Sequence, residues 1–254
     1  MASVDVVTPS VRPWRLQAGA AAAVLALSVA STALLLDGVR EGSGLSVWDG
    51  PTLRWMVAHR EPGATTVLTF ISALGTGVVY WTLALLAVVV FAVRRRWTEA
   101  LLLAVALVSA ESVSRIMKQV VNRSRPPAAL VLGPAEQNLS FPSGHTIAAA
   151  AFSLALAYLW WRARRGPFRA WLGLAIALAA TAVMAISRLY LADHWLTDVL
   201  ASIVLAFGVM AVVVLLDMFL QQRFLSGNGH PRSDLPKPRS TDELGDTGAS
   251  GLSG

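Results

Sequence analysis

Long apolar runs without charge are the feature that most constrains how this 254-residue chain can fold. A helix needs about 20 apolar residues to cross the hydrocarbon core of a bilayer. We therefore expect an all-α integral membrane bundle of six transmembrane helices. The six runs cover residues 16–36, 62–93, 98–121, 146–161, 170–186 and 195–220.

The run at residues 62–93 is uncharged throughout and too long for one simple span. Gly75 and Gly77 interrupt it, and glycine is a strong local breaker of helical patterns. We expect a short lead-in segment followed by a span over residues 77–93.

The composition excludes several classes of protein. Only 14% of the residues are charged, against about 25% in a soluble domain, and 55% are hydrophobic. A soluble globular protein, a disordered chain and a nucleic-acid binder are therefore poor interpretations, despite the net charge of +6. The absence of cysteine excludes disulfide frameworks, zinc–thiolate sites and thiol nucleophiles.

The basic residues predict an orientation in the membrane. Most of those outside the runs lie in the N-terminal segment, in the second and fourth connections and in the C-terminal tail. Because cytoplasmic loops carry an excess of Lys and Arg, both termini are expected in the cytoplasm of a cell with an inner (plasma) membrane. The first run is long enough to favour an uncleaved anchor over a signal peptide.

Three segments result from these boundaries. Residues 1–15 form a cytoplasmic N-terminal segment, residues 16–220 form the membrane domain, and residues 221–254 form a disordered cytoplasmic tail rich in Gly, Ser, Pro and charge. For the long outer loop at residues 37–61 we expect a lid or a substrate entry.

A first cluster of charged residues closes the third run. Lys118 and Arg125 flank the end of the helical pattern, which Pro126 terminates. Glu111, Arg115 and Lys118 are spaced i, i+4, i+7 and therefore share one helix face. Lys118 and Arg125 can be phosphate ligands or groups that snorkel to lipid headgroups. We interpret Arg115 and Glu111 as a structural ion pair.

A second cluster is Pro142-Ser143-Gly144-His145, immediately before the fourth run. Ser143 is a favourable N-cap, and a helix N-terminus with free N–H groups is a ready site for anions. His145 would then lie on the first turn, beside a bound anion. The alternative is a capped helix start with a histidine at the interface.

A third cluster joins the last two runs. Arg188 closes the fifth run, His194 opens the sixth, and the connection between them is short. His194 and Asp198 are spaced i, i+4 on one helix, so the carboxylate can fix the tautomer of the imidazole. Such orientation suits an imidazole that acts as a nucleophile or a base. Asp193 is adjacent to His194 but does not share its helical face.

All three clusters fall at the outer ends of their runs, where they combine three cations, an N–H nest and two histidines. No Asp, Glu or His grouping has the spacing of metal ligands, so these cations must neutralise the charge of a phosphate. Intramembrane charges are functional candidates because they are costly. We expect a phosphate site without a metal or other cofactor.

The ordered motifs resemble the three-part signature of the type-2 phosphatidic-acid phosphatase family, which also includes the vanadium-dependent haloperoxidases. The matching elements are Lys118-x6-Arg125-Pro126, Pro142-Ser143-Gly144-His145 and Arg188-x5-His194-x3-Asp198.

The resemblance implies a metal-independent phosphatase that acts through a phosphohistidine. It assigns His194 as the nucleophile, Asp198 as the group that orients it, and His145 as the general acid. The phosphoryl oxygens would be held by Lys118, Arg125, Ser143, Gly144 and Arg188.

A site at headgroup level suits a phosphate on a lipid that stays in the bilayer. Among the substrates that the resemblance offers, undecaprenyl pyrophosphate is favoured, with phosphatidic acid and phosphatidylglycerol phosphate as alternatives. Three other functions compete with lipid hydrolysis: non-catalytic binding or transport of lipid phosphates, a haloperoxidase, which six spans argue against, and a purely structural membrane protein.

Overall fold

The computed structural model describes residues 13–134 and 136–227, and this part of the chain is helical with connecting loops and no strand. The elements in chain order are α1 (Pro13–Glu41), η1 (Gly44–Trp48), α2 (Asp49–Ala58), α3 (Pro62–Leu74), α4 (Gly77–Val93), α5 (Trp97–Val121), η2 (Ala128–Leu130), α6 (Gly144–Ala163), α7 (Pro167–Tyr190) and α8 (Leu196–Gly227). The expected all-α class is therefore confirmed.

Five helices are long and apolar enough to cross a membrane by themselves: α1, α5, α6, α7 and α8. Helices α3 and α4 pass the same test together but are bent by 56°, so they form either one broken span, which would be the sixth, or a re-entrant loop. The break lies between Leu74 and Gly77, so the expected division of the run at residues 62–93 is confirmed. The protein is a multi-pass membrane protein.

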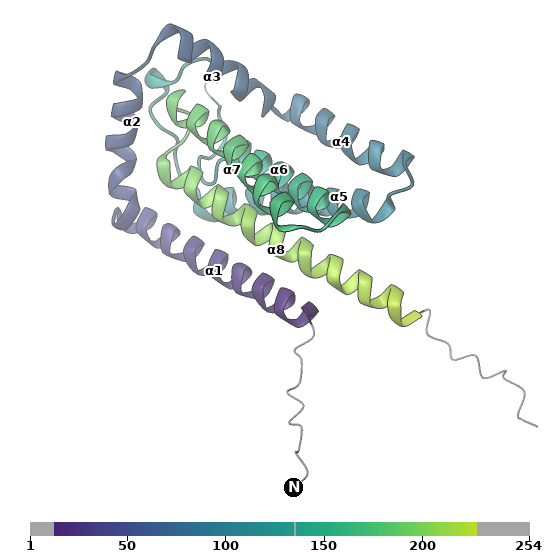
Figure 1. The fold of residues 1–254 in the computed structure, drawn as a ribbon. Helices are drawn as coiled ribbons and strands as arrows, with labels where there is room; N and C mark the ends of the chain where they lie inside the picture. Colours follow the sequence, from purple (N-terminus) through teal and green to yellow (C-terminus); the bar gives the residue numbers. More distant parts are fainter. Residues whose placement is uncertain (1–12, 135, 228–254) are drawn as a thin grey trace, which may run out of the picture.

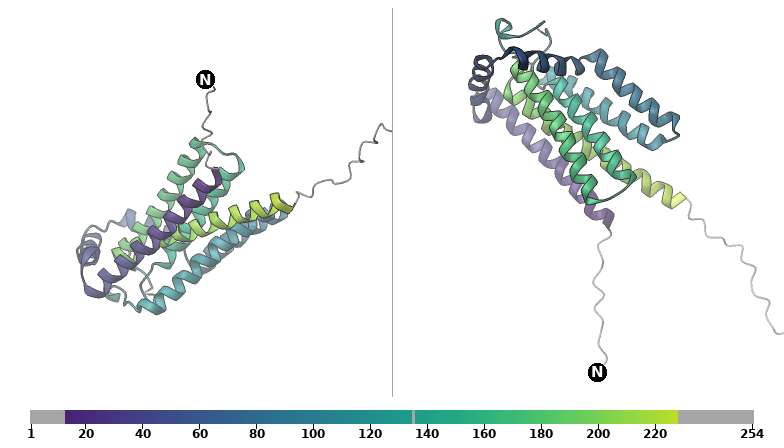
Figure 2. Two further views of the ribbon diagram at one scale, coloured as in Figure 1. Left: turned by 90° about the horizontal axis from the view of Figure 1, so that it is seen from below. Right: turned by 45° about the horizontal axis from the view of Figure 1, so that its top comes forward.

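Helix α6 lies inside the bundle, where it packs along α5, α7 and α8. Helix α1 packs along α8, α4 packs along α5, and α3 crosses over α7 (Figure 1). The short helix α2 covers one end of the bundle, beside α7 and α8. Both ends of the described chain leave from the opposite end (Figure 2).

The buried interior is built largely from small side chains. Alanine supplies many of the fully buried positions on α5 and α6, including Ala106, Ala110, Ala150 and Ala151. Small residues let helix backbones approach closely, which is how membrane helices associate in a solvent as apolar as their own side chains. Large apolar side chains such as that of Val78 face outward, where lipid surrounds them.

A buried carboxylate joins the helices at the end remote from α2. Asp217 of α8 is fully buried and accepts hydrogen bonds from the Tyr158 hydroxyl at 2.7 Å and from Arg162 Nε at 2.7 Å. Arg162 also lies 3.4 Å from Glu99 of α5. Because a buried charge is costly unless it is paired and hydrogen-bonded, this network ties α5, α6 and α8 together.

One boundary differs from the sequence-based expectation. Helix α8 continues through Gly227, so residues 221–227, which we assigned to the disordered tail, are helical. The apolar run ends near residue 220, but neither proline nor a strong breaker follows before Gly227. The rest of the predicted tail, and residues 1–12, lie outside the described residues.

Substitution of Gly208 by leucine should loosen the contact between α1 and α8. Ser28 of α1 lies directly over Gly208, with its Cβ 3.1 Å from where a side chain would begin. We expect G208L to cost about 2 kcal/mol, as overpacking does elsewhere, and to lower the melting temperature in detergent. Gly19 of α1 has open space around it, so G19L is the matched control. An unchanged melting temperature for G208L would contradict this packing.

Candidate active site

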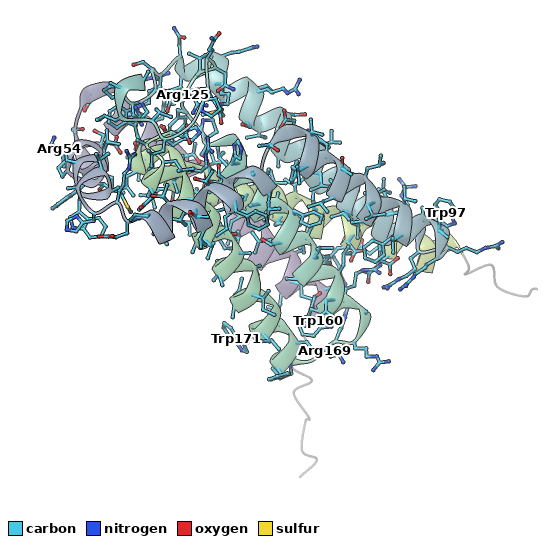
Figure 3. The ribbon with its side chains drawn as sticks, turned by 90° about the horizontal axis from the view of Figure 1, so that it is seen from above. Arg54, Trp97, Arg125, Trp160, Arg169 and Trp171 are labelled. Carbon is cyan, nitrogen blue, oxygen red and sulfur yellow. The ribbon has the colours of Figure 1, made fainter. Side chains whose placement is uncertain are left out.

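A cavity of about 1030 Å³ opens at the end of the bundle that α2 covers. Residues of α3, α4, α5, α6 and α7 line it, together with the loop between η2 and α6. Four of the residues expected to bind or process phosphate are in its wall: Lys118, Gly144, His145 and Arg188. Arg125 is not in the wall but contacts Glu136 and Asn138, which are, and it lies remote from Trp97, Trp160, Arg169 and Trp171 (Figure 3).

The expected pairing of His194 with Asp198 is present, although His194 lies in the turn before α8 rather than on the helix. Its Nδ1 is 3.4 Å from Asp198 Oδ2, and both side chains are fully buried. Arg125 Nη1 lies 3.2 Å from the other ring nitrogen, Nε2. Since a guanidinium can only donate, Nε2 carries the lone pair and Nδ1 carries the hydrogen.

Arg125 and Arg188 converge on one point in front of His194. The carboxylate of Glu136 bridges them, with Oε2 2.7 Å from Arg125 Nη2 and Oε1 2.6 Å from Arg188 Nη2. Two guanidiniums that hold the two oxygens of one anion form a site suited to phosphate. A phosphate that binds there has to replace the carboxylate of Glu136.

His145 reaches the same point from α6. Its Nδ1 lies 3.7 Å from Glu136 Oε1, so it faces the anion from a different side than His194 does. The break between α3 and α4 brings the backbone of Gly75 against the imidazole ring: a Cβ on Gly75 would be 2.5 Å from His145 Cδ2. The break between α3 and α4 therefore packs directly against one side of the His145 ring.

The charged face of α5 lines the same cavity, as the spacing of its residues predicts. Lys118 donates to the carbonyl of Leu139 and lies 3.3 Å from Asn138 Oδ1. The ion pair of Glu111 with Arg115 is confirmed at 2.5 Å.

Ser143 is the N-cap of α6, as expected, and its Oγ accepts from the N–H of Thr146 at 3.4 Å. The side chain is completely buried and also contacts Thr146 Oγ1. It supports the start of the helix, whereas the neighbouring Gly144 lines the cavity. Contact of Ser143 with phosphate stays a prediction.

Sequence reasoning missed four residues that complete the site, Asp49, Arg123, Glu136 and Ser140, and it predicted Gly75 as a helix breaker without its contact with His145. Arg123 donates to Asp198 Oδ1 at 2.6 Å and to Asp49 Oδ2 at 2.6 Å, and Ser140 donates to Asp198 Oδ2. Arg123 stands inside the segment from Lys118 to Arg125, so its position offered a signal. Asp49 and Glu136 lie in loops or beside them, where no periodicity indicates what they contact.

The electrostatics of the connecting segments agree with this geometry. Burial raises the pKa of Glu136, but the cations of Arg188 and Arg125 outweigh that effect and lower it to about 2. Burial lowers the pKa of His194 to about 4, although the hydrogen bond that His194 donates to Asp198 opposes this effect. His194 is therefore neutral near pH 7, the state in which an imidazole nitrogen is nucleophilic.

Among the described residues, no group of three or more His, Asp or Glu side chains is placed to hold a metal ion. The positive charge facing the anion comes instead from Arg125, Arg188 and Lys118.

Fold and site together define a helical membrane protein with a cationic anion site flanked by two histidines. A model of the PAP2 superfamily matches residues 99–221, which contain all three motifs. Phosphatidylglycerophosphatase B of Bacillus subtilis (strain 168) is 30% identical over 150 residues, which are 57% of this chain and 70% of that protein. The chain belongs to the PAP2 superfamily.

Two solved structures share the fold. A transmembrane PAP2-type phosphatidylglycerolphosphate phosphatase from Bacillus subtilis superposes with a TM-score of 0.68 at 24% identity, over 77% of this chain and 96% of that one. LpxE of Aquifex aeolicus superposes with a TM-score of 0.51 at 20% identity, over 66% of this chain and 94% of that one. These two structures show the shared fold, whereas the match to the PAP2 superfamily and to phosphatidylglycerophosphatase B supports a phosphatase activity.

Substitution of Gly75 by alanine should displace the ring of His145. The new methyl group would meet His145 Cδ2 at 2.5 Å and Met184 Cε at 3.0 Å. We expect phosphate release from a lipid phosphate to fall about tenfold or more, because misplacing a reacting group by 1 Å can cost about 100-fold. G77A is the matched control, since nothing lies within 4 Å of a Cβ there. Equal activity of G75A and G77A would refute this contact.

The imidazole of His194 should not titrate in the range where histidine ordinarily does. Because its pKa is lowered to about 4, it stays neutral as the pH falls from about 8 to about 5.5. NMR of ring-labelled histidine in detergent, assigned with H194Q, checks this directly. A midpoint near the ordinary pKa of about 6.5 would contradict the buried, neutral state.

Proposed function

We propose that this protein is a metal-independent lipid phosphatase that acts through a phosphohistidine on His194. The observation that carries the proposal is the convergence of Arg125 and Arg188 on one anion, in front of Nε2 of His194 and beside His145. Phosphoryl transfer depends mainly on positioning and charge stabilisation, and these groups supply both.

In the first step, Nε2 of His194 attacks phosphorus, and the bond from phosphorus to the lipid oxygen breaks. Arg125 and Arg188 hold the phosphoryl oxygens, with Lys118 close to them in the cavity wall. His145 gives its proton to the lipid oxygen as that oxygen leaves. Asp198 stabilises the positive charge that develops on His194 through the hydrogen bond to Nδ1.

In the second step, water attacks the phosphohistidine and the bond between nitrogen and phosphorus breaks. His145, which is now neutral, takes a proton from the water, so its role reverses. Inorganic phosphate leaves, His194 returns to its neutral form, and Glu136 can again bridge the two guanidiniums. No metal ion takes part in this scheme.

The substrate we favour is a phosphomonoester on a lipid, with phosphatidylglycerol phosphate first. The name of the Bacillus relative supports this choice. Undecaprenyl pyrophosphate, which suits an outward-facing site, is the second candidate, and phosphatidic acid is the third. Thr69 of α3 and Tyr80 and Trp81 of α4 also line the cavity, so the lipid tail would lie beside these two helices.

The distribution of basic residues supports an extracytoplasmic active site with both termini in the cytoplasm of a cell bounded by an inner (plasma) membrane. Trp160, Arg169 and Trp171 lie together at the ends of α6 and α7 that are remote from Arg125, and Trp97 lies apart from them at the remote start of α5 (Figure 3). Aromatic residues of this kind typically mark a membrane interface.

The proposal is tested by phosphate release from the detergent-solubilised protein in the presence of EDTA. The panel contains phosphatidylglycerol phosphate, undecaprenyl pyrophosphate and phosphatidic acid, and the ranking of the rates identifies the substrate class. We expect H194A to lose at least about 1000-fold in rate, because the nucleophile is gone. His59 stacks on Trp55 of α2, so H59A is the matched control.

Trapping the intermediate checks the mechanism itself. Brief exposure to a substrate labelled on its terminal phosphate should label the protein in an acid-labile, alkali-stable form, and H194A should not be labelled. Release that persists in H194A would mean that another group is the nucleophile. Binding of lipid phosphate without any release, in a folded protein, would favour the binding or transport function.

A further inference from the structure

Helix α2 reaches the nucleophile through a chain of charged contacts. Asp49, the first residue of α2, is buried. Its Oδ1 accepts from the N–H of Thr197 at 2.9 Å, and its Oδ2 accepts from Thr197 Oγ1 at 2.8 Å and from Arg123 Nη2 at 2.6 Å. A segment from the outer loop thereby holds the first turn of α8.

Arg123 links Asp49 to Asp198 by binding both carboxylates. Its Nη1 donates to Asp198 Oδ1 at 2.6 Å and to Thr197 Oγ1 at 2.7 Å, while Nη2 donates to Asp49. The guanidinium also lies over the ring of Trp195, 5.4 Å from its centroid. A planar guanidinium fixes the direction of each hydrogen bond, which a flexible ammonium group does not.

The second oxygen of Asp198 is the one that faces the nucleophile. Oδ2 accepts from the N–H of Trp195 at 2.9 Å and from the hydroxyl of Ser140, and it lies 3.4 Å from Nδ1 of His194. Because Arg123 binds Oδ1, the carboxylate cannot rotate away from the imidazole without breaking a bond to a charged partner.

We propose that Arg123 and Asp49 are positioning residues for the nucleophile: Arg123 fixes the carboxylate of Asp198 against His194, and Asp49 fixes Arg123. This inference rests on the proposed function, in which His194 attacks phosphorus. It also gives the outer loop at residues 37–61 a role in catalysis. Through Asp49 this loop helps to hold His194 in position.

The geometry separates this role from phosphate binding. The hydrogen bonds of Arg123 go to Asp49, Thr197 and Asp198, whereas Arg125 and Arg188 contact the anion. Loss of Arg123 should therefore slow the chemical step without weakening the site for phosphate. In kinetic terms kcat falls, while KM and the Kd for inorganic phosphate stay within about twofold of their original values.

The test uses four variants of the full-length protein in detergent. R123Q removes both charged contacts, R123K keeps the charge without the fork, and D49N removes the charge that holds Arg123. We expect kcat to fall about 10- to 100-fold in R123Q and about tenfold in D49N, with partial recovery in R123K. R54Q is the matched control, because Arg54 is exposed on α2, the helix that begins at Asp49, and lies at the outer edge of the molecule, apart from Arg125 (Figure 3).

A measurement that needs no turnover distinguishes failure of this inference from failure of the proposed function. Proton NMR of ring-labelled histidine should show a strongly deshielded Nδ1–H of His194, hydrogen-bonded to Asp198, in the intact protein and in R54Q. In R123Q this resonance should shift upfield or exchange with water, although Arg125 still donates to Nε2 and keeps the hydrogen on Nδ1. This result would stand even if no lipid were hydrolysed. An unchanged Nδ1–H resonance of His194 in folded R123Q, or a kcat equal to that of R54Q, would overturn the inference. A raised Kd for phosphate at unchanged kcat would make Arg123 a binding residue instead.

Discussion

The site depends on one constraint: three guanidinium groups lie at the end of an apolar bundle, where an unpaired charge would be costly. Each guanidinium is matched by carboxylates. Arg123 lies between Asp49 and Asp198, and Arg125 and Arg188 share Glu136. The carboxylate of Asp198 is thereby turned toward His194, and the two remaining arginines face a position that an exchangeable anion can take. The contacts that neutralise these charges are therefore the same contacts that set the proposed catalytic geometry.

The break between α3 and α4 brings backbone and side-chain atoms into contact with the site. A continuous helix through residues 62–93 would carry its backbone straight past the site, whereas the bend of 56° brings Gly75 against the ring of His145. The same bend brings Ser72 into contact with Arg188. One irregular turn thus supports His145, the proposed general acid, and Arg188, one of the proposed phosphate ligands.

The sequence predicted the features that depend on local composition or on the order of motifs along the chain. Apolar runs predicted the spans, and Gly75 and Gly77 predicted the break, because local chain chemistry decides both. The three clusters predicted that Lys118, His145 and Arg188 meet at one cavity. The partners of those residues could not be predicted, because Glu136 and Asp49 act through loop geometry and contacts between distant segments.

Helix α8 carries a buried carboxylate near each of its ends. Asp198 is bound by Arg123 at one end, and Asp217 is bound by Arg162 at the other. One residue inserted between them would rotate the far end of the helix by about 100° and advance it by about 1.5 Å. Only one of the two carboxylates could then keep its arginine. The number of residues between Asp198 and Asp217 is therefore as constrained as their identity. It determines whether both carboxylates can face their arginines at once.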